Sequence, residues 1–402
     1  MDTQTLNFTR TINASLAEVY RAFTNSTTLR EWFCDVATLD PKPGGRFYAA
    51  WNAGFFASGE YTALVPDEKV AFTWQGRDEP GRTSIEVTLR PQDGKTVVEL
   101  AHAGLGASAE WSQMVAEATK GWQSDLENLE SVLETGQDLR FVRRPMLGIG
   151  LSDFNAEIAA QLDVPVSEGM RIDSTLENMG ARAAGLQNND VIVSIAGRPV
   201  TDYPSLVAAL QGHRADETVQ VVFYRGPEKQ TVNMLLSRRP LPDIPSTAGA
   251  LADFVLKRSA EIQSDLEGFF TGVSEAEASI KPAPQEWSIK EVLAHLIHGE
   301  RYGQLWMVEL IDGNEAHHDG WGGNLLAQVE ATASVYPTIQ EMLADYGRLR
   351  EETIALIARL PQDFVARKGS YWRLAYNLVD DPFHHRLHLD QMRLALAAAR
   401  SQ

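Results

Sequence analysis

The spacing of hydrophobic positions changes twice along the chain, and the first stretch favours a sheet covered by a helix. Hydrophobic and polar residues alternate in "TSIEVTLR" and "KTVVELAH", which predicts two strands joined at the turn "PQDG". Ser15 and Glu18 form a capping-box pattern before a helical run. A long apolar stripe at helical steps closes the stretch and needs a sheet to pack on. The stripe consists of Trp111, Val115, Ala118, Trp122, Leu126, Leu129 and Leu133.

The middle stretch predicts a small β-rich fold. The segment "PMLGIGL" and the segment "AGLQNNDVIVSIAGRPV" have the composition of strands bounded by turns. A short helical run, "SLVAAL", is followed by "VQVVFYRGPEKQTVNMLL", in which a hairpin turn is expected at "RGPE". Strand, turn, strand, short helix and terminal hairpin suit a small barrel with an open edge.

The last stretch is typical of helices. Apolar residues recur at steps of three and four in several segments, and Ser288 is the expected cap of the second one. Four amphipathic helices favour an antiparallel bundle. The predicted helical segments are residues 251–270, 288–311, 338–360 and about 382–400.

Two seams separate these stretches. Residues 134–145 follow the first helical stripe, and residues 238–249 hold three prolines, which do not fit inside a regular element. A chain of 402 residues is also longer than one core usually supports. We therefore expect a multidomain protein with an α+β domain, a small β-rich barrel and an all-α four-helix bundle. The predicted domains are residues 1–138, 142–240 and 248–402.

Charge and cysteine content limit the expected partners and compartment. The 36 basic and 54 acidic residues give a net charge of -18, which works against binding nucleic acid or an anionic membrane. The opening residues lack the apolar run of an export signal and no stretch of about 18 apolar residues occurs, so we expect a cytoplasmic protein. Cys34 is the single cysteine, which excludes an internal disulfide and a cysteine-based zinc cluster.

Three histidines of the segment "DPFHHRLHLDQM" stand out near the end of the chain. On a helical wheel, His384 and His388 fall in the middle of the apolar arc with Gln391 beside them, whereas His385 falls at its edge and is expected at the rim. The apolar arc also holds Phe383, Leu387, Met392, Ala395 and Leu396, and the opposite arc holds Arg386, Asp390, Arg393 and Arg400.

A fourth histidine, His295, faces the predicted core from another helix, where Val292, Tyr302 and Trp306 flank it. Three inward imidazoles from two helices can supply three nitrogens to one divalent cation and leave a fourth position open. Zinc or nickel fits such nitrogen ligation. The alternative is that these histidines are structural residues held by mutual hydrogen bonds, because an inward imidazole without a partner is costly.

The first stretch resembles the START-like (SRPBCC) superfamily, in particular the group named for an activator of a heat-shock chaperone ATPase. The resemblance rests on "LREWF", "PGGRF", "GEYTALVPDEKVAFTW" and "GWQSDLENLESVL". It implies a helix-grip fold that traps a small apolar ligand between helix and sheet, although aromatic residues here can also be core residues alone. His102 is expected at the surface end of a strand. The residues that would line the cavity are Trp32, Phe47, Trp51, Trp74 and Trp122.

The middle stretch resembles a PDZ domain of the kind found in HtrA-type proteases, and "AGLQNNDVIVSIAGRPV" carries the match. The preceding "MGARAAGL" departs from the usual turn. The resemblance implies that backbone N–H groups of Leu147, Gly148 and Ile149 receive a peptide carboxylate and that the peptide adds as a strand, with Leu206 and Leu210 walling the groove. Alternatively, this module binds no peptide and only spaces or dimerises its neighbours. No G-x-S-x-G motif accompanies it.

The last stretch resembles the DinB superfamily, including its thiol-dependent transferases, through "EWSIKEVLAHLIHGE" and "HHRLHLDQM". The metal triad of that family carries over onto His295, His384 and His388. The resemblance implies thiol transfer or metal-assisted hydrolysis of a small electrophile. No general base is assigned, although Glu291, Glu300 and Tyr302 lie near in sequence.

Two hypotheses follow from these observations. In the first, the C-terminal bundle is a metal-dependent transferase or hydrolase, while the other modules bind a small molecule and a protein C-terminal peptide. In the second, the chain is a non-catalytic adaptor with a START-like cavity, a PDZ-type peptide site and a metal-stabilised bundle. The sequence leaves open whether the protein is an enzyme at all.

Overall fold

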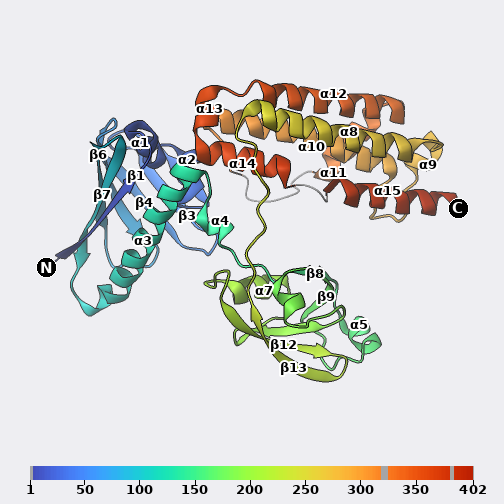
Figure 1. The fold of residues 1–402 in the computed structure, drawn as a ribbon, viewed down its shortest axis with the longest axis horizontal. Coiled ribbons are helices and arrows are strands. Elements are labelled where there is room, and N and C mark those ends of the chain that lie inside the picture. Colours follow the sequence, from blue (N-terminus) through green and yellow to red (C-terminus); the bar gives the residue numbers. More distant parts are fainter. Residues whose placement is uncertain (1–2, 318–324, 381–383, 402) are drawn as a thin grey trace. The chain divides into compact units, whose positions relative to one another are not determined.

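The computed structural model describes residues 3–317, 325–380 and 384–401. It divides into two compact units, one formed by Met1–Asp138 together with Pro242–Gln402, the other by Leu139–Leu241 (Figure 1). The predicted multidomain class is confirmed, because an antiparallel α+β part, a small β-rich part and an all-helical part are all present. No helix among the described residues is long and apolar enough to cross a bilayer.

The N-terminal part is a seven-stranded antiparallel sheet in the order β1-β7-β6-β5-β4-β3-β2. The predicted turn "PQDG" joins β6 to β7, and the alternating segments on either side are paired in register along their whole length. The strands are β1 (Thr3–Ile12), β2 (Val36–Leu39), β3 (Arg46–Ala50), β4 (Phe56–Val65), β5 (Lys69–Gly76), β6 (Thr83–Gln92) and β7 (Lys95–Gly106).

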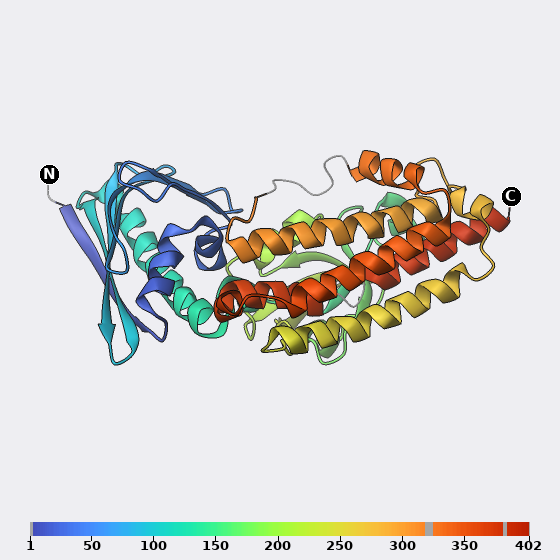
Figure 2. The same ribbon diagram turned by 90° about the horizontal axis from the view of Figure 1, so that it is seen from above.

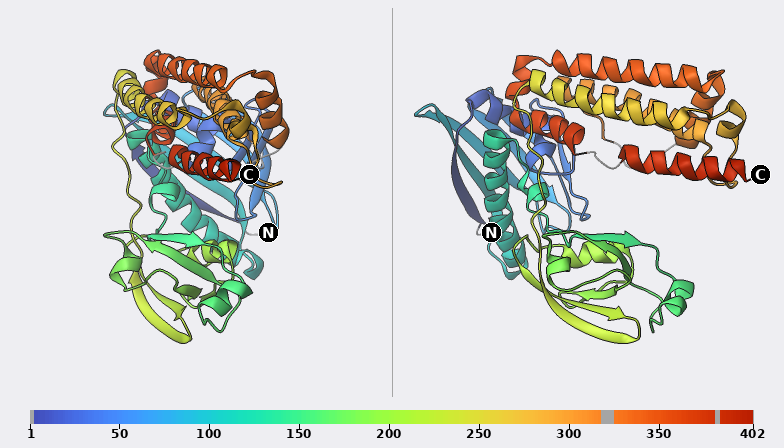
Figure 3. Two further views of the ribbon diagram at one scale, coloured as in Figure 1. Left: turned by 90° about the vertical axis from the view of Figure 1, so that its right-hand side faces the viewer. Right: turned by 45° about the vertical axis from the view of Figure 1, so that its right-hand side comes forward.

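Three helices accompany this sheet, namely α1 (Leu16–Thr24), α2 (Ser26–Trp32) and α3 (Ser112–Thr135). The Ser15–Glu18 capping box at the start of α1 is confirmed. Helix α3 lies along the sheet (Figure 3) and buries the second half of its predicted stripe, while Trp111 precedes it as the N-cap residue. Burial of this stripe against the sheet is the main apolar contact of the domain. The buried α3 side chains are Trp122, Leu126, Asn128, Leu129 and Val132.

The unit formed by residues 139–241 is an antiparallel sheet in the order β13-β12-β10-β9-β8, with β11 paired to β10. The predicted hairpin at "RGPE" joins β12 to β13. Strand β8 stands at the end of the order and pairs only with β9 among the described strands. The elements are α4 (Leu139–Val142), β8 (Ile149–Ser152), α5 (Ala156–Gln161), β9 (Met170–Thr175), α6 (Gly180–Ala183), β10 (Val191–Ile195), β11 (Arg198–Pro199), α7 (Tyr203–Leu210), β12 (Thr218–Arg225) and β13 (Glu228–Leu235).

The C-terminal part is helical (Figure 2), and its four predicted segments correspond to α8 (Ala248–Phe270), α10 (Ile289–Asp312), α12 (Ile339–Ala358) and α15 (His384–Arg400). Helices α10 and α12 run in the same direction, because Lys290 donates to the Tyr336 carbonyl just before α12 and Gln304 donates to Thr353 near its end. The predicted start of the last helix at Pro382 lies outside the described residues. Shorter helices not anticipated from the sequence are α9 (Glu275–Ser279), α11 (Leu325–Val335), α13 (Gln362–Ala366) and α14 (Lys368–Val379).

The start of α10 is fixed by a capping box, as predicted. The Ser288 hydroxyl accepts from the Glu291 N–H, and the Glu291 carboxylate accepts from the Ser288 N–H and pairs with Lys281 at 2.8 Å. Ser288 and Glu291 are both buried. The cap therefore satisfies N–H groups that water cannot reach, and it sets where the helix carrying His295 begins.

We expect Ser288→Ala to lower the free energy of unfolding by about 1–2 kcal/mol, because it leaves a buried N–H group without an acceptor. Urea titration followed by circular dichroism measures the loss. Ser274→Ala is the matched control, since Ser274 forms the same capping box with Glu277 at the exposed start of α9. A loss at position 288 no larger than at position 274 would contradict the assignment.

Candidate functional site

Two of the three predicted metal ligands come together in the helical part. The imidazole rings of His295, on α10, and His388, on α15, have centroids 4.8 Å apart with an interplanar angle of 59°. Both side chains are half-buried. The Trp287 ring lies against His295 at a centroid distance of 5.1 Å. Two helices distant in sequence thus present imidazoles to one point, as the resemblance to the DinB superfamily implies.

Gln391, which the helical wheel places beside His388, contacts its ring. The His388 Nδ1 atom lies 3.0 Å from Gln391 Oε1. Because an amide oxygen only accepts hydrogen bonds, this contact requires the proton on Nδ1 and leaves the lone pair of Nε2 for another partner. A partner that fixes the tautomer in this way is the usual second contact of a metal-binding histidine.

The remaining histidines of α15 differ in what the structure describes. The side chain of His384 lies outside the described residues, so its part in the triad stays a prediction. The expectation that His385 lies at the rim is wrong, because only 12% of its side chain is exposed and Nε2 lies 3.5 Å from Asp265 of α8. Burial lowers the pKa of His385, although Asp265 acts against this. Leu387, expected inside, is exposed instead.

None of the carboxylates near His295 in sequence is aimed at the histidine pair. Glu291 belongs to the α10 cap. Glu300 points toward α12, where Arg350 donates to it at 2.6 Å and the Thr353 hydroxyl donates at 3.0 Å. Tyr302 is exposed. The structure therefore supports leaving the general base unassigned.

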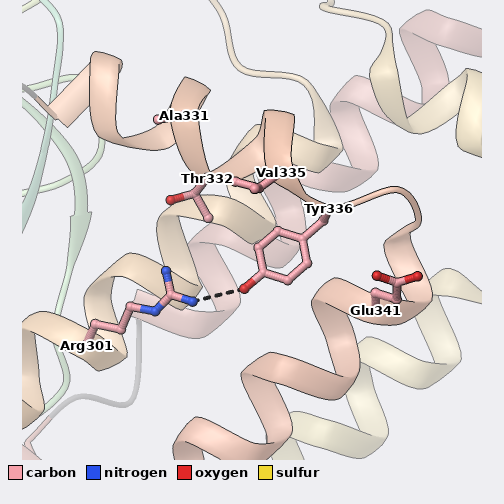
Figure 4. Close-up of a pocket in the computed structure, with 6 residues that line it drawn as sticks. All are labelled: Arg301, Ala331, Thr332, Val335, Tyr336 and Glu341. Atoms are coloured by element: carbon pink, nitrogen blue, oxygen red, sulfur yellow. Dashed lines mark hydrogen bonds between the residues drawn. The ribbon is translucent and has the colours of Figure 1, made fainter.

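A surface pocket of about 430 Å³ lies between α10, α11 and α12 (Figure 4). Arg301 donates to the Tyr336 hydroxyl at 2.9 Å across it, but Asp345 pairs with the same guanidinium at 3.0 Å and offsets its charge. No predicted site residue lines this pocket, and we assign no function to it. The lining residues are Arg301, Ala331, Thr332, Val335, Tyr336 and Glu341.

The predicted carboxylate loop precedes the edge strand β8. Gly148 has a φ of +77°, and a Cβ built there would stand 2.3 Å from the Met179 Cβ, so the position requires glycine. The Leu147 carbonyl accepts a hydrogen bond from the Ala181 N–H at 3.0 Å, and the Gly148 carbonyl accepts one from the Leu176 N–H at 2.8 Å. Both carbonyls are therefore bonded to the backbone of the same unit. Loop conformation is thus fixed before any ligand arrives.

The apolar residues predicted for the peptide groove share one core. Leu147 and Leu206 are buried in it, and Ile149 and Leu210 pack partly buried against it. Tyr203 and Val207 of the same helix α7 are exposed. An edge strand together with an accessible apolar helix face is the arrangement that strand addition uses, while peptide binding itself stays a prediction.

The aromatic residues predicted for a ligand cavity form one packed cluster around Phe33. The Phe33 ring stacks on Trp122 at 5.3 Å and meets Trp51 edge-on at 5.1 Å. Trp74 contacts Phe47 and Trp122 at 6.1 Å each. Trp32 is fully buried, and Trp51 is half-buried. The residues come together, and their ligand-binding role stays a prediction.

The expected surface position of His102 is wrong, because its side chain is buried in this cluster. Trp122 donates to Nδ1 at 3.2 Å, so Nε2 carries the proton and donates to the Thr83 hydroxyl at 2.8 Å. Thr83 in turn donates to the Trp74 carbonyl. Burial lowers the pKa of His102 to about 4. The alternation of buried and less buried residues along β7 indicates this position, since His102 lies on the same face of the strand as Val98 and Leu100.

Comparison with known families agrees with the three-part reading. Residues 13–134 match the family model described as Activator of Hsp90 ATPase homolog 1-like protein, residues 145–236 that of a PDZ domain, and residues 260–392 that of the DinB superfamily. The three resemblances inferred from the sequence are thereby confirmed. Each model covers about a third of the chain or less.

Individual relatives are similar to single parts of the chain. The Serine protease Do-like HtrA of Lactococcus lactis subsp. cremoris is 31% identical over 163 residues, which is 39% of this chain and 35% of the relative. The periplasmic serine endoprotease DegP of Escherichia coli K12 is 27% identical over 161 residues, 40% of this chain and 29% of that protein. The chain thus spans about a third of the length of these curated relatives.

Among solved structures, the Aha1 dimer from Colwellia psychrerythraea is 23% identical with a TM-score of 0.30, and covers 33% of this chain and 97% of its own. An HSP90 activator from Plasmodium falciparum is 26% identical with a TM-score of 0.28, and covers 32% of this chain and 95% of its own.

We expect the N-terminal domain to lose stability as the pH falls from 6.5 to about 4. In this window the histidine of the unfolded chain binds a proton, whereas buried His102 in the folded domain does not. The free energy of unfolding therefore falls, by about 3 kcal/mol over the whole window. His102→Gln removes this proton uptake. Urea unfolding followed by tryptophan fluorescence, measured across the window for both proteins, tests the difference, and equal acid slopes would contradict it.

Proposed function

We propose that the C-terminal helical region is a metal-dependent enzyme of DinB type, built as a four-helix bundle, that acts on a small electrophile by thiol transfer or hydrolysis. The observation that carries the proposal is the meeting of the His295 and His388 rings from two helices at 4.8 Å. His384 is the proposed third ligand, one helical turn before His388. Zinc or nickel is the proposed cation, because three neutral nitrogens suit both.

The chain's own residues have distinct tasks in this proposal. His295 and His388 bind the cation, and Gln391 holds His388 in the tautomer whose lone pair is on Nε2. Apolar side chains of α10 and α15 that are buried beside the pair, Leu296 and Met392, keep bulk water away from that side. A divalent cation held there would act as a Lewis acid that lowers the pKa of a water or a thiol.

The other two domains are proposed to bind ligands. With boundaries at 1–138, 142–240 and 248–402, the first would hold a small apolar molecule within its aromatic cluster, and the second would bind a protein C-terminal peptide. We propose a cytoplasmic location from the single cysteine among 402 residues, and cell fractionation tests it. Proposed contacts are Trp32, Phe47, Trp51, Trp74 and Trp122 in the first, and Leu147, Gly148, Ile149, Leu206 and Leu210 in the second.

The second candidate function is a non-catalytic adaptor that senses a small molecule and holds a protein tail. The first two domains match families of ligand-binding type, and a chain made of such modules can act by binding alone. In this case the bundle is a metal-stabilised scaffold and the cation has no catalytic task. The experiment on the histidines separates the two functions.

We expect the purified protein to contain about one equivalent of zinc or nickel, and a His295→Ala/His384→Ala/His388→Ala variant to contain at least about tenfold less. Elemental analysis by mass spectrometry measures the metal. Turnover of 1-chloro-2,4-dinitrobenzene with cysteine as the thiol should fall in parallel while the circular dichroism spectrum is kept.

His298→Ala is the matched control, because His298 lies half-buried on the same helix but outside the pair. It should keep the metal. Equal metal content in the triple variant and the parent would remove the enzyme proposal, and metal loss without any turnover in the parent would favour the adaptor.

We expect Gly148→Ala to abolish binding of peptides through their C-terminus, since the added methyl group meets Met179 and strains a left-handed backbone. Fluorescence anisotropy with labelled peptides ending in an apolar residue measures this, and the same peptides amidated at the C-terminus should not bind. Gly212→Ala is the control, because Gly212 has a φ of +88° and open space around it. Equal affinity for acid and amide peptides would contradict the proposed site.

A further inference from the structure

Helix α2 of the N-terminal domain and helix α14 of the helical part lie in contact within one compact unit (Figure 1). The contact contains charged side chains that are buried rather than solvated. Arg373 of α14 makes two bonds to the Glu315 carboxylate, at 2.8 and 3.0 Å, and Arg30 of α2 lies 3.4 Å from the same carboxylate. Only 5% of the Glu315 side chain is exposed. Glu315 therefore has its counterions.

Glu31, the neighbour of Arg30 on α2, is in a different position. Only 3% of its side chain is exposed, and its Oε1 accepts from the Ser370 hydroxyl, a neutral donor. The nearest guanidinium atom, Arg373 Nη1, is 3.8 Å away and already bonded to Glu315. On the other side, a Cβ built at Gly369 would stand 2.6 Å from Oε2, so the backbone of α14 closes over the carboxyl. A negative charge here would have neither water nor a counterion of its own.

The further charged groups around this carboxyl come from several elements and partly cancel. Arg367, at the start of α14, and Glu315 act on Glu31 directly with opposite sign. Arg21 of α1 acts on Arg367, as do Asp312 at the end of α10 and Asp363 of α13, while Asp138 after α3 acts on Arg373.

We propose that Glu31 docks onto α14 as a neutral carboxyl and that loss of its proton loosens the N-terminal domain from the helical part. Burial raises the pKa of Glu31 to about 7, against the lowering by Arg373 and Ser370. Because the docked pKa exceeds that of a solvated glutamate, docking is fully favoured below pH 4.5 and weakens as the pH rises to about 7. The proposal is independent of any metal chemistry.

Glu31 lies close to two other regions of the chain. The next residues, Trp32 and Phe33, enter the aromatic cluster, where Phe33 stacks on Trp122. On the other side, α14 precedes α15, which carries His388. Glu31 thus lies next to the aromatic cluster in sequence and against α14 in space.

Hydrogen exchange of the full chain, followed by mass spectrometry and corrected for the intrinsic pH dependence of amide exchange, tests the proposal. Between pH 5.5 and 7.5 we expect the protection of peptides from α2 and α14 to fall about twentyfold, as the titration of one carboxyl between 4.5 and about 7 requires. In Glu31→Gln, which keeps the shape without the charge, this fall should vanish.

Two further variants keep the test decisive. Glu130→Gln removes a part-buried ion pair between α3 and Arg10 of β1, away from α14, and should leave the twentyfold fall unchanged. Ser370→Ala removes the hydrogen bond that favours the carboxylate and should move the midpoint of the fall to higher pH, a readout that survives if Glu31→Gln does not fold. A fall of equal size in Glu31→Gln, an unmoved midpoint in Ser370→Ala, or no fall in the parent would overturn the proposal.

Discussion

The contact between the N-terminal domain and the helical part depends on the buried Glu315 carboxylate, which pairs with Arg373 within the helical part and with Arg30 of α2 across the contact. Burial raises the pKa of Glu315, but Arg373 and Arg30 outweigh burial and hold that pKa below its usual range. The pKa of Glu31, in contrast, is raised. Two carboxyls that lie 2.8 and 3.8 Å from one guanidinium thus have pKa values shifted in opposite directions. Removing one partner from such a buried cluster is costly, because it leaves the remaining charge without water or a counterion.

Within the N-terminal domain, buried polar groups are satisfied by hydrogen bonds between neutral side chains. Trp122, His102 and Thr83 form a chain of hydrogen bonds that ends on a backbone carbonyl, so each polar atom in it has a partner inside an aromatic core. These hydrogen bonds link α3 to the sheet where the apolar stripe of the helix is buried. They fix the position of the helix along an otherwise apolar interface.

Much of this could be predicted from the sequence where the information is local. The Ser288 cap follows from the residue type before the helix, and the inward faces of His295 and His388 follow from helical periodicity, whereas their meeting is implied only by the resemblance to the DinB superfamily. The surface position expected for His102 is wrong because a polar residue can continue the buried face of a strand when its ring nitrogens are hydrogen-bonded, as they are here. Leu387 was misplaced because a wheel assigns faces without knowing which neighbours cover them. Glu31 could not be found at all, since its burial depends on α14, more than 300 positions away in the chain.

The chain's entry into and exit from the middle unit lie side by side. Met146 and Ser237 exchange two backbone hydrogen bonds of 2.9 Å, so the two ends of a stretch of about ninety residues are joined to each other. Units whose chain ends lie close together are the ones that tolerate insertion into another chain, because the surrounding chain has only a short distance to span. The middle unit has this property and a hydrophobic core of its own, so its fold does not require the buried charges of the other unit.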